Sequence, residues 1–243
     1  VGAVVGLLNG LPAACDADLC PRADFVGCVV RFVGHDLMDF RVDDWATYAS
    51  TGGGTLGGVD ACLAFDDADN RGLSSCLASG GTSLAQAYAQ VCDRVSLADF
   101  AVIAAEGLMA AVATNPAATA QMFRSNAMWG RTTATSCAHT QEGGLPNPEE
   151  SCNDLERVFG GHVYAGHGGS IDRHRSSRCA GPICGAVDAS HSGEYDGAEL
   201  DDFDGLERMW YLTAAISGAH TLGRALPQNS GYYGWWSDPQ SSS

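Results

Sequence analysis

Two stretches of the sequence carry side chains that can do acid–base or metal chemistry. Arg31 and His35 stand four residues apart in an otherwise apolar run, so on a helix they share one face. A cation and an imidazole buried together cost free energy unless they serve a purpose. His220 follows the small residues 217–219, which let another helix or a planar cofactor come close. The alternative for a single histidine near an apolar helix is a satisfied core residue.

Helices must hold these side chains in place, and the apolar spacing predicts a mainly α chain. The run that contains Arg31 and His35 predicts a buried helix over residues 24–40. Asp204 and Glu207 have the spacing of a capping box, which predicts that a second buried helix begins there and leads to the small residues named above. Further helices are expected over residues 82–93, 96–112 and 151–159.

The strongest helical pattern covers residues 96–112, which are rich in Ala and apolar on nearly every face. Ser96 and Asp99 stand three residues apart at its start, again the spacing of a capping box. We prefer this structural role for Asp99 to a catalytic one. The run 122–135 has a mixed pattern, and Leu-Pro-Asn-Pro at 145–148 predicts a turn.

Composition places the chain among ordinary globular proteins and argues against two classes of partner. The length of 243 residues allows a sizeable core, and we expect residues 1–243 to form a single domain. The formal charge is −16, and all 13 basic residues are Arg. Such a surface repels nucleic-acid phosphates and anionic lipids. No run is long and apolar enough to span a bilayer. We therefore expect no nucleic-acid partner and no membrane partner.

The cysteines indicate disulfides and an oxidising compartment. Their number is 10, they are spread along the chain, and none has the Cys-x-x-Cys spacing of a zinc site. Spacing does not determine their pairing, although Cys179–Cys184 and Cys137–Cys152 are candidate local loops. The apolar run 1–8 lacks a basic start and a cleavage site, so we interpret it as the start of a mature or trimmed chain. A secreted protein with long disulfide-pinned loops is expected.

Residues 160–203 form an irregular segment with little periodicity, rich in Gly, His, Asp and Ser. The segment contains several histidines, which are His162, His167, His174 and His191. Their spacing matches no standard metal site. We therefore favour a solvated, disulfide-pinned loop over a metal centre for this segment.

Five motifs follow one another in the order found in a known family. Residues 31–36 read Arg-Phe-Val-Gly-His-Asp, and residues 217–224 read Ser-Gly-Ala-His-Thr-Leu-Gly-Arg. Between them lie Gly-Gly-Val-Asp-Ala-Cys at 57–62, Asp-Asn-Arg-Gly-Leu at 69–73 and Val-Ser-Leu-Ala-Asp-Phe at 95–100. The set resembles the plant, fungal and bacterial haem peroxidase superfamily, in particular its secreted members. A haem-peroxidase-like helical fold is what this resemblance implies.

The resemblance implies one haem b and gives a role to four side chains. His220 would be the proximal ligand of the haem iron. On the distal face, His35 would move a proton between the oxygens of hydrogen peroxide, and Arg31 would stabilise the negative charge on the departing oxygen. Asn70 would accept a hydrogen bond from the ring N–H of His35 and keep the imidazole basic and in one tautomer.

The resemblance also implies calcium. Asp36 and Asp60 match the carboxylates of a distal calcium site, which would be completed by backbone carbonyls of the Gly-rich loop that precedes Asp60. Where the family has a serine ligand this chain has Cys62, a poor oxygen substitute whose alternative is a disulfide. Thr221 matches a ligand of a second calcium site.

Two further expectations follow from the same resemblance. Residues 160–203 would be a loop insertion before the proximal helix, near the opening of the substrate channel. Cys92 stands where secreted plant members have a cysteine bonded to the N-terminal region. Its partner would then be Cys15 or Cys20.

Two departures from the family pattern matter. Gly34 stands immediately before His35, where the family has Phe or Trp. After the run 232–239 the family continues for several helices, one of which carries an Asp that hydrogen-bonds the proximal imidazole. No residue of this chain can be given that role. Either the chain is a fragment, or another chain completes the proximal lobe, or that lobe is degenerate.

The sequence leaves two main functional hypotheses. The first is a secreted haem peroxidase that reduces hydrogen peroxide and oxidises small reducing substrates by one-electron steps. The alternative is a haem-free, degenerate peroxidase-fold module with a structural or interaction role in an extracellular assembly. A calcium-dependent binding protein is a third, weaker interpretation, which depends on Asp36, Asp60 and the glycine loop alone. The presence of all four site side chains together favours the peroxidase, because a buried Arg–His pair costs free energy without return in an inert fold.

Overall fold

The computed structural model of the chain describes residues 1–16, 19–39, 57–78, 84–135, 137, 145–147, 154, 158–159 and 216–235. Contacts divide the chain into two units. The first consists of Val1–Leu37, Gly57–Thr140 and Gly218–Ser243, and the second of Met38–Leu56 and Gln141–Ser217. In the second unit the Asn147 N–H donates to Asp154 Oδ2 at 2.8 Å. Several expected features lie outside the described residues, namely the loop insertion 160–203, the helix from Asp204, most of the helix 151–159 and the Cys179–Cys184 loop.

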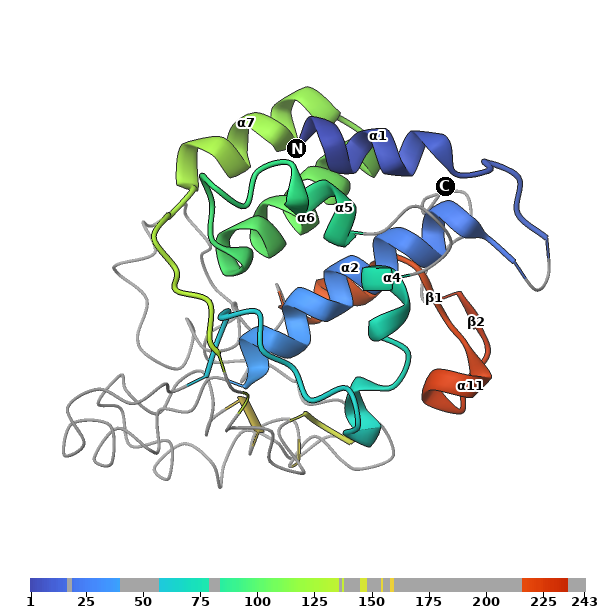
Figure 1. Cartoon of the computed structure of the whole chain (residues 1–243). Helices are drawn as coiled ribbons and strands as arrows, with labels where there is room; N and C mark the ends of the chain where they lie inside the picture. Colours follow the sequence, from blue (N-terminus) through green and yellow to red (C-terminus); the bar gives the residue numbers. More distant parts are fainter. Residues whose placement is uncertain are drawn as a thin grey trace, which may run out of the picture. The chain divides into compact units, whose positions relative to one another are not determined.

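The described part of the chain is mainly helical, as predicted (Figure 1). Its α-helices are α1 (Gly2–Gly10), α2 (Pro21–Met38), α4 (Ser74–Ala78), α5 (Leu84–Ala89), α6 (Leu97–Val112), α7 (Pro116–Asn126) and α11 (Pro227–Ser230). Its 3-10 helices are η1 (Ala68–Asn70) and η5 (Gly218–Thr221). Strands β1 (Arg224–Ala225) and β2 (Gly234–Trp235) form an antiparallel pair. None of the helices in these ranges is long and apolar enough to cross a membrane. The haem-peroxidase fold and the single domain stay predictions.

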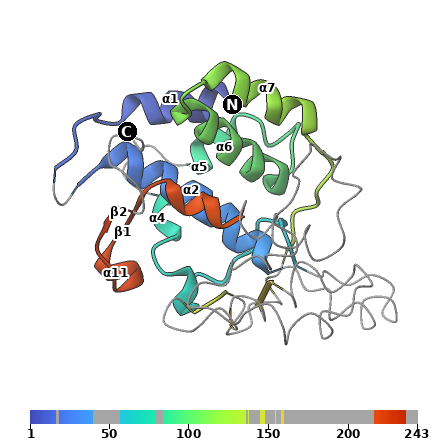
Figure 2. The same cartoon turned by 180° about the vertical axis from the view of Figure 1, so that it is seen from behind.

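Helix α2 carries Arg31 and His35. It begins at Pro21, three residues before the predicted start at Asp24, because proline lacks the N–H that the first helical turn leaves unpaired. Asp24 lies in that first turn and accepts a hydrogen bond from the Cys20 N–H at 3.2 Å, where the helix dipole favours a negative charge. In both views the segment that precedes β1, drawn in red, lies beside α2 (Figures 1 and 2).

The apolar core is shared by α1, α2, α5 and α6. Helix α6 matches the predicted range 96–112, with Ser96 as its N-cap: the Ser96 Oγ accepts from the Asp99 N–H at 3.0 Å. Helix α6 buries large side chains such as Phe100 and Leu108, and it packs against α1 and α7. The expected helix over 82–93 is shorter, since α5 ends at Ala89 and turns follow.

Helices α1 and α7 are not predicted by the sequence analysis. The apolar run at the N-terminus folds as α1, which buries Val4 and Leu8. Helix α7 begins at Pro116, and Asn115 Oδ1 caps it by accepting from the Ala118 N–H at 3.2 Å. An N-cap asparagine followed by a proline is a helix-start signal that is present in the sequence and could have located α7.

Cys62 and Cys137 form a disulfide, and this corrects the expected Cys137–Cys152 loop. The two residues are 75 apart in sequence, yet their Cα atoms lie 5.1 Å apart, within the range that a disulfide bridges. A pairing over such a distance is set by the tertiary structure and not by spacing. The disulfide alternative for Cys62 is therefore the one found, and Cys62 has no thiol to offer a metal.

A second disulfide joins Cys15 to Cys20, so neither cysteine is the partner expected for Cys92. Their Cα atoms are 4.3 Å apart, and the Asp16 N–H donates to the Leu19 carbonyl oxygen at 2.9 Å within the loop that they close. Cys92 is exposed, and it is the free cysteine among those that the structure describes. Cys28 is also disulfide-bonded.

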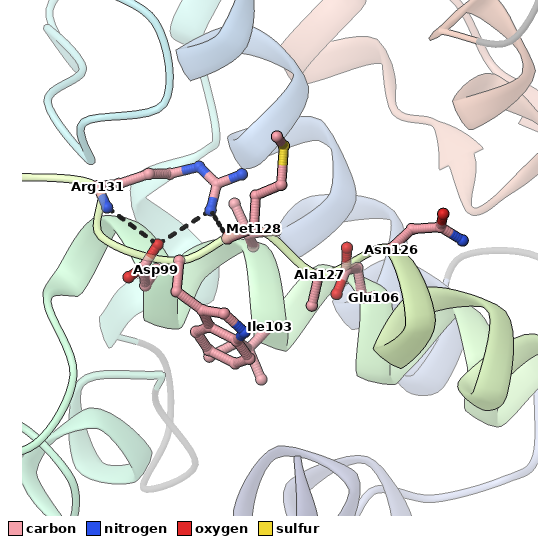
Figure 3. A pocket seen from close by; sticks show the side chains of 9 residues that line it. Asp99, Ile103, Glu106, Asn126, Ala127, Met128 and Arg131 are labelled. Atoms are coloured by element: carbon pink, nitrogen blue, oxygen red, sulfur yellow. Dashed lines mark hydrogen bonds and ion pairs between the residues drawn. The ribbon is translucent and has the colours of Figure 1, made fainter.

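Asp99 joins the segment after α7 to helix α6, next to the pocket drawn in Figure 3. Its carboxylate accepts hydrogen bonds from the backbone N–H groups of Gly130 and Arg131 at 2.8 and 3.3 Å, and from Arg131 Nη1 at 2.9 Å. Burial alone would raise the pKa of Asp99, but these hydrogen bonds outweigh it and lower the pKa. The role of Asp99 is structural: its N–H binds the Ser96 cap, as a capping box predicts, but its carboxylate accepts from residues 130–131.

We expect Asp99→Ala to lower the free energy of unfolding by about 3 kcal/mol, because two N–H groups and the Arg131 guanidinium would lose their acceptor. Urea unfolding under oxidising conditions would measure the change. Asp93→Asn is the matched control, since it removes an exposed ion pair with Arg94 (N–O distance 3.5 Å) and should cost less than about 0.5 kcal/mol. Equal effects of the two substitutions would contradict the proposed role of Asp99.

Candidate functional site

Arg31 and His35 share one face of α2, as their spacing predicts. The Arg31 Nε–H donates to His35 Nε2 at 3.2 Å. Both residues are half-buried. Burial lowers the pKa of Arg31, while the nearby charge of Asp69 acts in the opposite direction. A guanidinium keeps its charge in proteins, so a cation lies directly against one ring nitrogen of His35.

Two backbone carbonyls fix the Arg31 guanidinium. Its Nη1 donates to the Arg71 carbonyl oxygen at 2.8 Å, and its Nη2 donates to the Asp69 carbonyl oxygen at 2.6 Å. These carbonyls belong to the turn formed by η1, where Asp67 Oδ1 accepts from the Asp69 N–H at 3.0 Å. A cation held in this way needs little reorganisation when a negative charge develops beside it.

Asn70 orients the imidazole of His35. Asn70 Oδ1 lies 2.9 Å from His35 Nδ1, and Asn70 Nδ2 donates to the Ala64 carbonyl oxygen at 3.0 Å. Since the amide nitrogen faces a carbonyl, the amide oxygen must face His35, and His35 Nδ1 carries the proton. The lone pair of His35 is then on Nε2, where Arg31 donates to it. We call these three side chains the Arg31–His35–Asn70 network.

Burial lowers the pKa of His35 to about 4. The positive charge of Arg31 lowers it further, while the hydrogen bond with Asn70 raises it. His35 is therefore neutral at physiological pH. A neutral imidazole whose Nε2 lone pair only accepts a hydrogen bond can take up a proton, and one with a low pKa returns that proton readily.

His220 lies in η5, in the same unit as the network. The residue is exposed, and its charge is one of the causes that lower the pKa of His35. The two imidazoles therefore lie within electrostatic range of each other. Ala219 and Leu222 pack against the core, so the turn is anchored by its apolar side. The structure thus brings His220 toward the network, although the two lie far apart in sequence.

Asp36 and Asp60 lie together near the end of α2. Asp36 is 0% exposed, and its two carboxylate oxygens accept from the Ala61 N–H at 2.8 Å and the Cys62 N–H at 3.1 Å. Asp60 Oδ1 accepts from the same Cys62 N–H at 3.0 Å. Burial raises the pKa of Asp36 to about 7, and the neighbouring charge of Asp60 adds to this effect.

The described residues do not complete a calcium site. Calcium takes about six to eight oxygen ligands, whereas Asp36 and Asp60 already accept backbone N–H groups and Cys62 is in a disulfide. Thr221 Oγ1 donates to the Gly218 carbonyl oxygen at 2.7 Å within its own turn. Most of the glycine loop before Asp60 lies outside the described residues. Calcium binding stays a prediction, and the chemistry of the Arg31–His35–Asn70 network does not depend on it.

Sequence reasoning missed the backbone groups of the site. The carbonyls of Asp69 and Arg71, which hold Arg31, have no signature in side-chain types. Gly34 stands where the family has Phe or Trp. A Cβ placed on Gly34 would meet none of the described atoms within 4 Å. The face of α2 next to His35 is thus free of packing against the described residues at this position.

Comparison of the chain with known proteins identifies no relative. No protein-family model, no curated protein and no solved structure matches the chain significantly. The family resemblance of the five motifs therefore enters the function only as a proposal.

The low pKa of His35 should make stability depend on pH. The pKa of a histidine in the unfolded chain is about 6.5, whereas the pKa of His35 in the folded chain is about 4. Between these values the unfolded state binds a proton that the folded state does not, so the contribution of His35 is complete above pH 6.5 and is lost as the pH falls. We expect the stability advantage of the wild type over His35→Gln to shrink by about 3 kcal/mol between neutral pH and pH 4. Urea unfolding at a series of pH values would measure it.

Asp36 provides a control of opposite sign. Its pKa is raised to about 7 in the folded chain, so the folded state binds a proton that the unfolded state releases between about pH 3.9 and 7. The wild type should therefore lose stability through Asp36 as the pH rises, and Asp36→Asn should not show this loss. If His35→Gln and Asp36→Asn change the pH dependence in the same direction, the protonation states assigned to these two residues are wrong.

Proposed function

We propose that this chain is a haem peroxidase, which takes hydrogen peroxide as oxidant and a small reducing substrate as electron donor. The observation that carries the proposal is the Arg31–His35–Asn70 network, with the second imidazole of His220 within electrostatic range. A neutral oriented base and a fixed cation are the groups that O–O cleavage needs. The imidazole of His220 would supply a ligand for the haem iron.

The donor set suits haem better than a metal ion held by side chains alone. In the described ranges no group of three or more His, Cys, Asp or Glu side chains could hold a metal ion. His220 is an exposed imidazole that follows Gly218 and Ala219, whose small side chains let a flat ring come close. His220 would hold the haem iron, and haem would supply the redox chemistry with peroxide.

His35 would transfer the proton. Its Nε2 lone pair faces the Arg31 Nε–H at 3.2 Å, a long hydrogen bond that an O–H group of hydrogen peroxide can replace. The imidazole takes the proton from one peroxide oxygen and returns it to the other, which leaves as water. The pKa of about 4 keeps His35 neutral before this step and makes the return of the proton favourable.

Arg31 and Asn70 would support that transfer in different ways. Each terminal nitrogen of Arg31 carries two N–H groups and uses one on a backbone carbonyl, which leaves one on each for the departing oxygen. The guanidinium stabilises the negative charge that develops there. Asn70 Oδ1 holds the proton of His35 on Nδ1, so that Nε2 stays the acceptor.

The compartment is part of the same proposal. The Cys15–Cys20 and Cys62–Cys137 disulfides favour an oxidising environment. We therefore place the enzyme outside the cytosol, as a secreted protein.

Hemin binding tests the proposal directly. Hemin added to the purified, disulfide-intact protein should give a Soret absorption band that shifts on addition of hydrogen peroxide. His220→Ala should weaken hemin binding by about tenfold or more, since it removes the iron ligand, and free imidazole should restore the band. His35→Gln is the matched control: it should bind hemin normally but react with peroxide about 100-fold more slowly or worse.

The alternative function has its own outcome in this experiment. A wild-type protein that forms no Soret band with hemin would exclude the peroxidase and favour the haem-free structural or interaction module. A band that survives unchanged in His220→Ala would remove His220 from the role of ligand.

Asn70 should affect the reaction with peroxide and not hemin binding. In Asn70→Val the His35 Nδ1–H loses its acceptor, so the imidazole is free to rotate and to change tautomer. We expect a decrease of about tenfold to 100-fold in the rate constant with peroxide. Stopped-flow absorption would measure it, and hemin affinity would serve as the internal control. An unchanged rate constant would show that Asn70 does not orient the base.

A further inference from the structure

The segment that follows His220 contacts both elements that hold the Arg31–His35–Asn70 network. This segment, residues 222–235, contains β1, α11 and β2. We call it the C-terminal hairpin. In Figures 1 and 2 it lies beside the first half of α2. Three of its contacts are close enough that a small change of side chain at the contact would displace the backbone of the hairpin.

The first contact is an ion pair between the hairpin and the start of α2. Arg224 Nε donates to Asp24 Oδ1 at 2.7 Å, and Arg224 Nη2 donates to Asp24 Oδ2 at 2.9 Å. The Arg224 side chain is 3% exposed, and its hydrogen bonds to Asp24 raise its pKa. A two-pronged pair of this kind fixes orientation as well as distance, and a buried arginine without its partner is costly.

The second contact is between two glycine backbones. A Cβ on Gly27 would lie 2.9 Å from the Cα of Gly223, and a Cβ on Gly223 would lie 2.8 Å from the Cα of Gly27. Gly223 also has a φ of +80°, which disfavours any other residue. The chain three residues after His220 therefore lies directly on α2, with no side chain between the two backbones.

The third contact reaches the turn that holds Arg31. A Cβ on Gly72 would lie 2.5 Å from the side chain of Asn229 in α11, and Gly72 has a φ of +83°. Gly72 follows Arg71, whose carbonyl oxygen accepts from Arg31. The hairpin therefore packs on the turn that supplies the carbonyls as well as on the helix that supplies the imidazole.

The contacts on α2 lie on the same face of the helix as the network. Asp24, Gly27, Arg31 and His35 fall on one face of α2, and about 12 Å of helix separates Gly27 from His35. On the other side of the contact, His220 precedes Gly223 by three residues. The backbones touch at Gly27 and Gly223, so this contact sets how far the imidazole of His220 lies from that of His35.

We propose that the C-terminal hairpin positions His220 opposite the Arg31–His35–Asn70 network, with Asp24, Arg224, Gly27 and Gly223 as positioning residues. The inference rests on the proposed haem peroxidase function, in which His220 would hold the haem iron and His35 would act on hydrogen peroxide. Ala219 and Leu222 also hold the η5 turn on the core, but apolar contacts of a short turn restrict its rotation less than the paired ions and the backbone contact do. Loss of the Asp24–Arg224 or the Gly27–Gly223 contact should leave the network in place and displace His220.

Gly27→Ala tests the inference in the haem-free protein. The added methyl group has to displace the hairpin, so the ring nitrogen signals of His220 in nitrogen-15 NMR spectra should shift while those of His35 change little. The spectra of all variants would be recorded at the same mildly alkaline pH. Gly6→Ala in α1 is the matched control: it is also a helical glycine, but a Cβ there meets no described atom within 4 Å. Gly6→Ala should leave both sets of signals at their wild-type positions.

A second substitution covers the case in which Gly27→Ala does not fold. Asp24→Asn keeps the volume of the side chain and breaks the ion pair with Arg224, and it should shift the His220 signals in the same way. Asp93→Asn, which breaks the exposed pair with Arg94, should not. A folded Asp24→Asn or Gly27→Ala protein with lower thermal stability but unshifted His220 signals would overturn the inference, since the contacts would then be structural only.

Hemin binding separates this inference from the proposed function. If wild type binds hemin, Asp24→Asn should weaken the binding by about tenfold, as substitutions of residues that orient a metal ligand do, and should change the coordination of the iron in electron paramagnetic resonance spectra. If wild type does not bind hemin, the proposed function fails, while the NMR comparison still decides whether the hairpin positions His220. Unchanged hemin affinity and spectra in Asp24→Asn would overturn the positioning role.

Discussion

A neutral imidazole held between an amide oxygen and a fixed guanidinium is the interaction on which the rest of the site depends. His35 is buried enough that its charged form is disfavoured, and Arg31 beside it adds to that effect. The pair is tolerated because every polar group in it has a partner: Asn70 takes the Nδ1–H, and two carbonyls take the guanidinium. The turn at η1 supplies these partners. It presents the amide of Asn70 and the carbonyls on either side to the same face of α2.

The parts of the site that could be predicted from sequence are those that local spacing determines. Arg31 and His35 meet because residues four apart on a helix are neighbours, and α2 and α6 follow from apolar periodicity and capping residues. A hydrogen bond between Asn70 and His35 was expected from a family resemblance, and Asn70 Oδ1 lies 2.9 Å from His35 Nδ1, while the resemblance itself stays a prediction. The carbonyls that hold Arg31 could not be foreseen, because every residue has a carbonyl and only the fold decides which ones converge.

Long-range pairings account for most of what sequence reasoning missed. Cys137 bonds to Cys62 and not to a nearby cysteine, and Arg224 pairs with Asp24 from the far end of the chain. Neither partner is marked by its own neighbours in sequence. Helix α7 is a different case, because Asn115 and Pro116 form a start signal that is local and visible in the sequence. The long-range pairings were missed because tertiary packing determines them. Helix α7 was missed although local chemistry alone identifies its cap.

The Cys62–Cys137 disulfide places one part of the Arg31–His35–Asn70 network inside a covalently closed loop and leaves the other part outside it. It closes a covalent ring between residues 75 apart in sequence, and this ring contains Asn70 and the carbonyls of Asp69 and Arg71. Arg31 and His35 lie outside the ring, on α2. Ring closure lowers the entropy of the unfolded chain by an amount worth about 4 kcal/mol in the chain-entropy description. On unfolding with disulfides intact, the acceptors thus stay within a constrained loop, and the disulfide-bonded Cys28 keeps a cross-link three residues before Arg31. Reassembly of the site therefore brings together two segments that each carry a covalent cross-link.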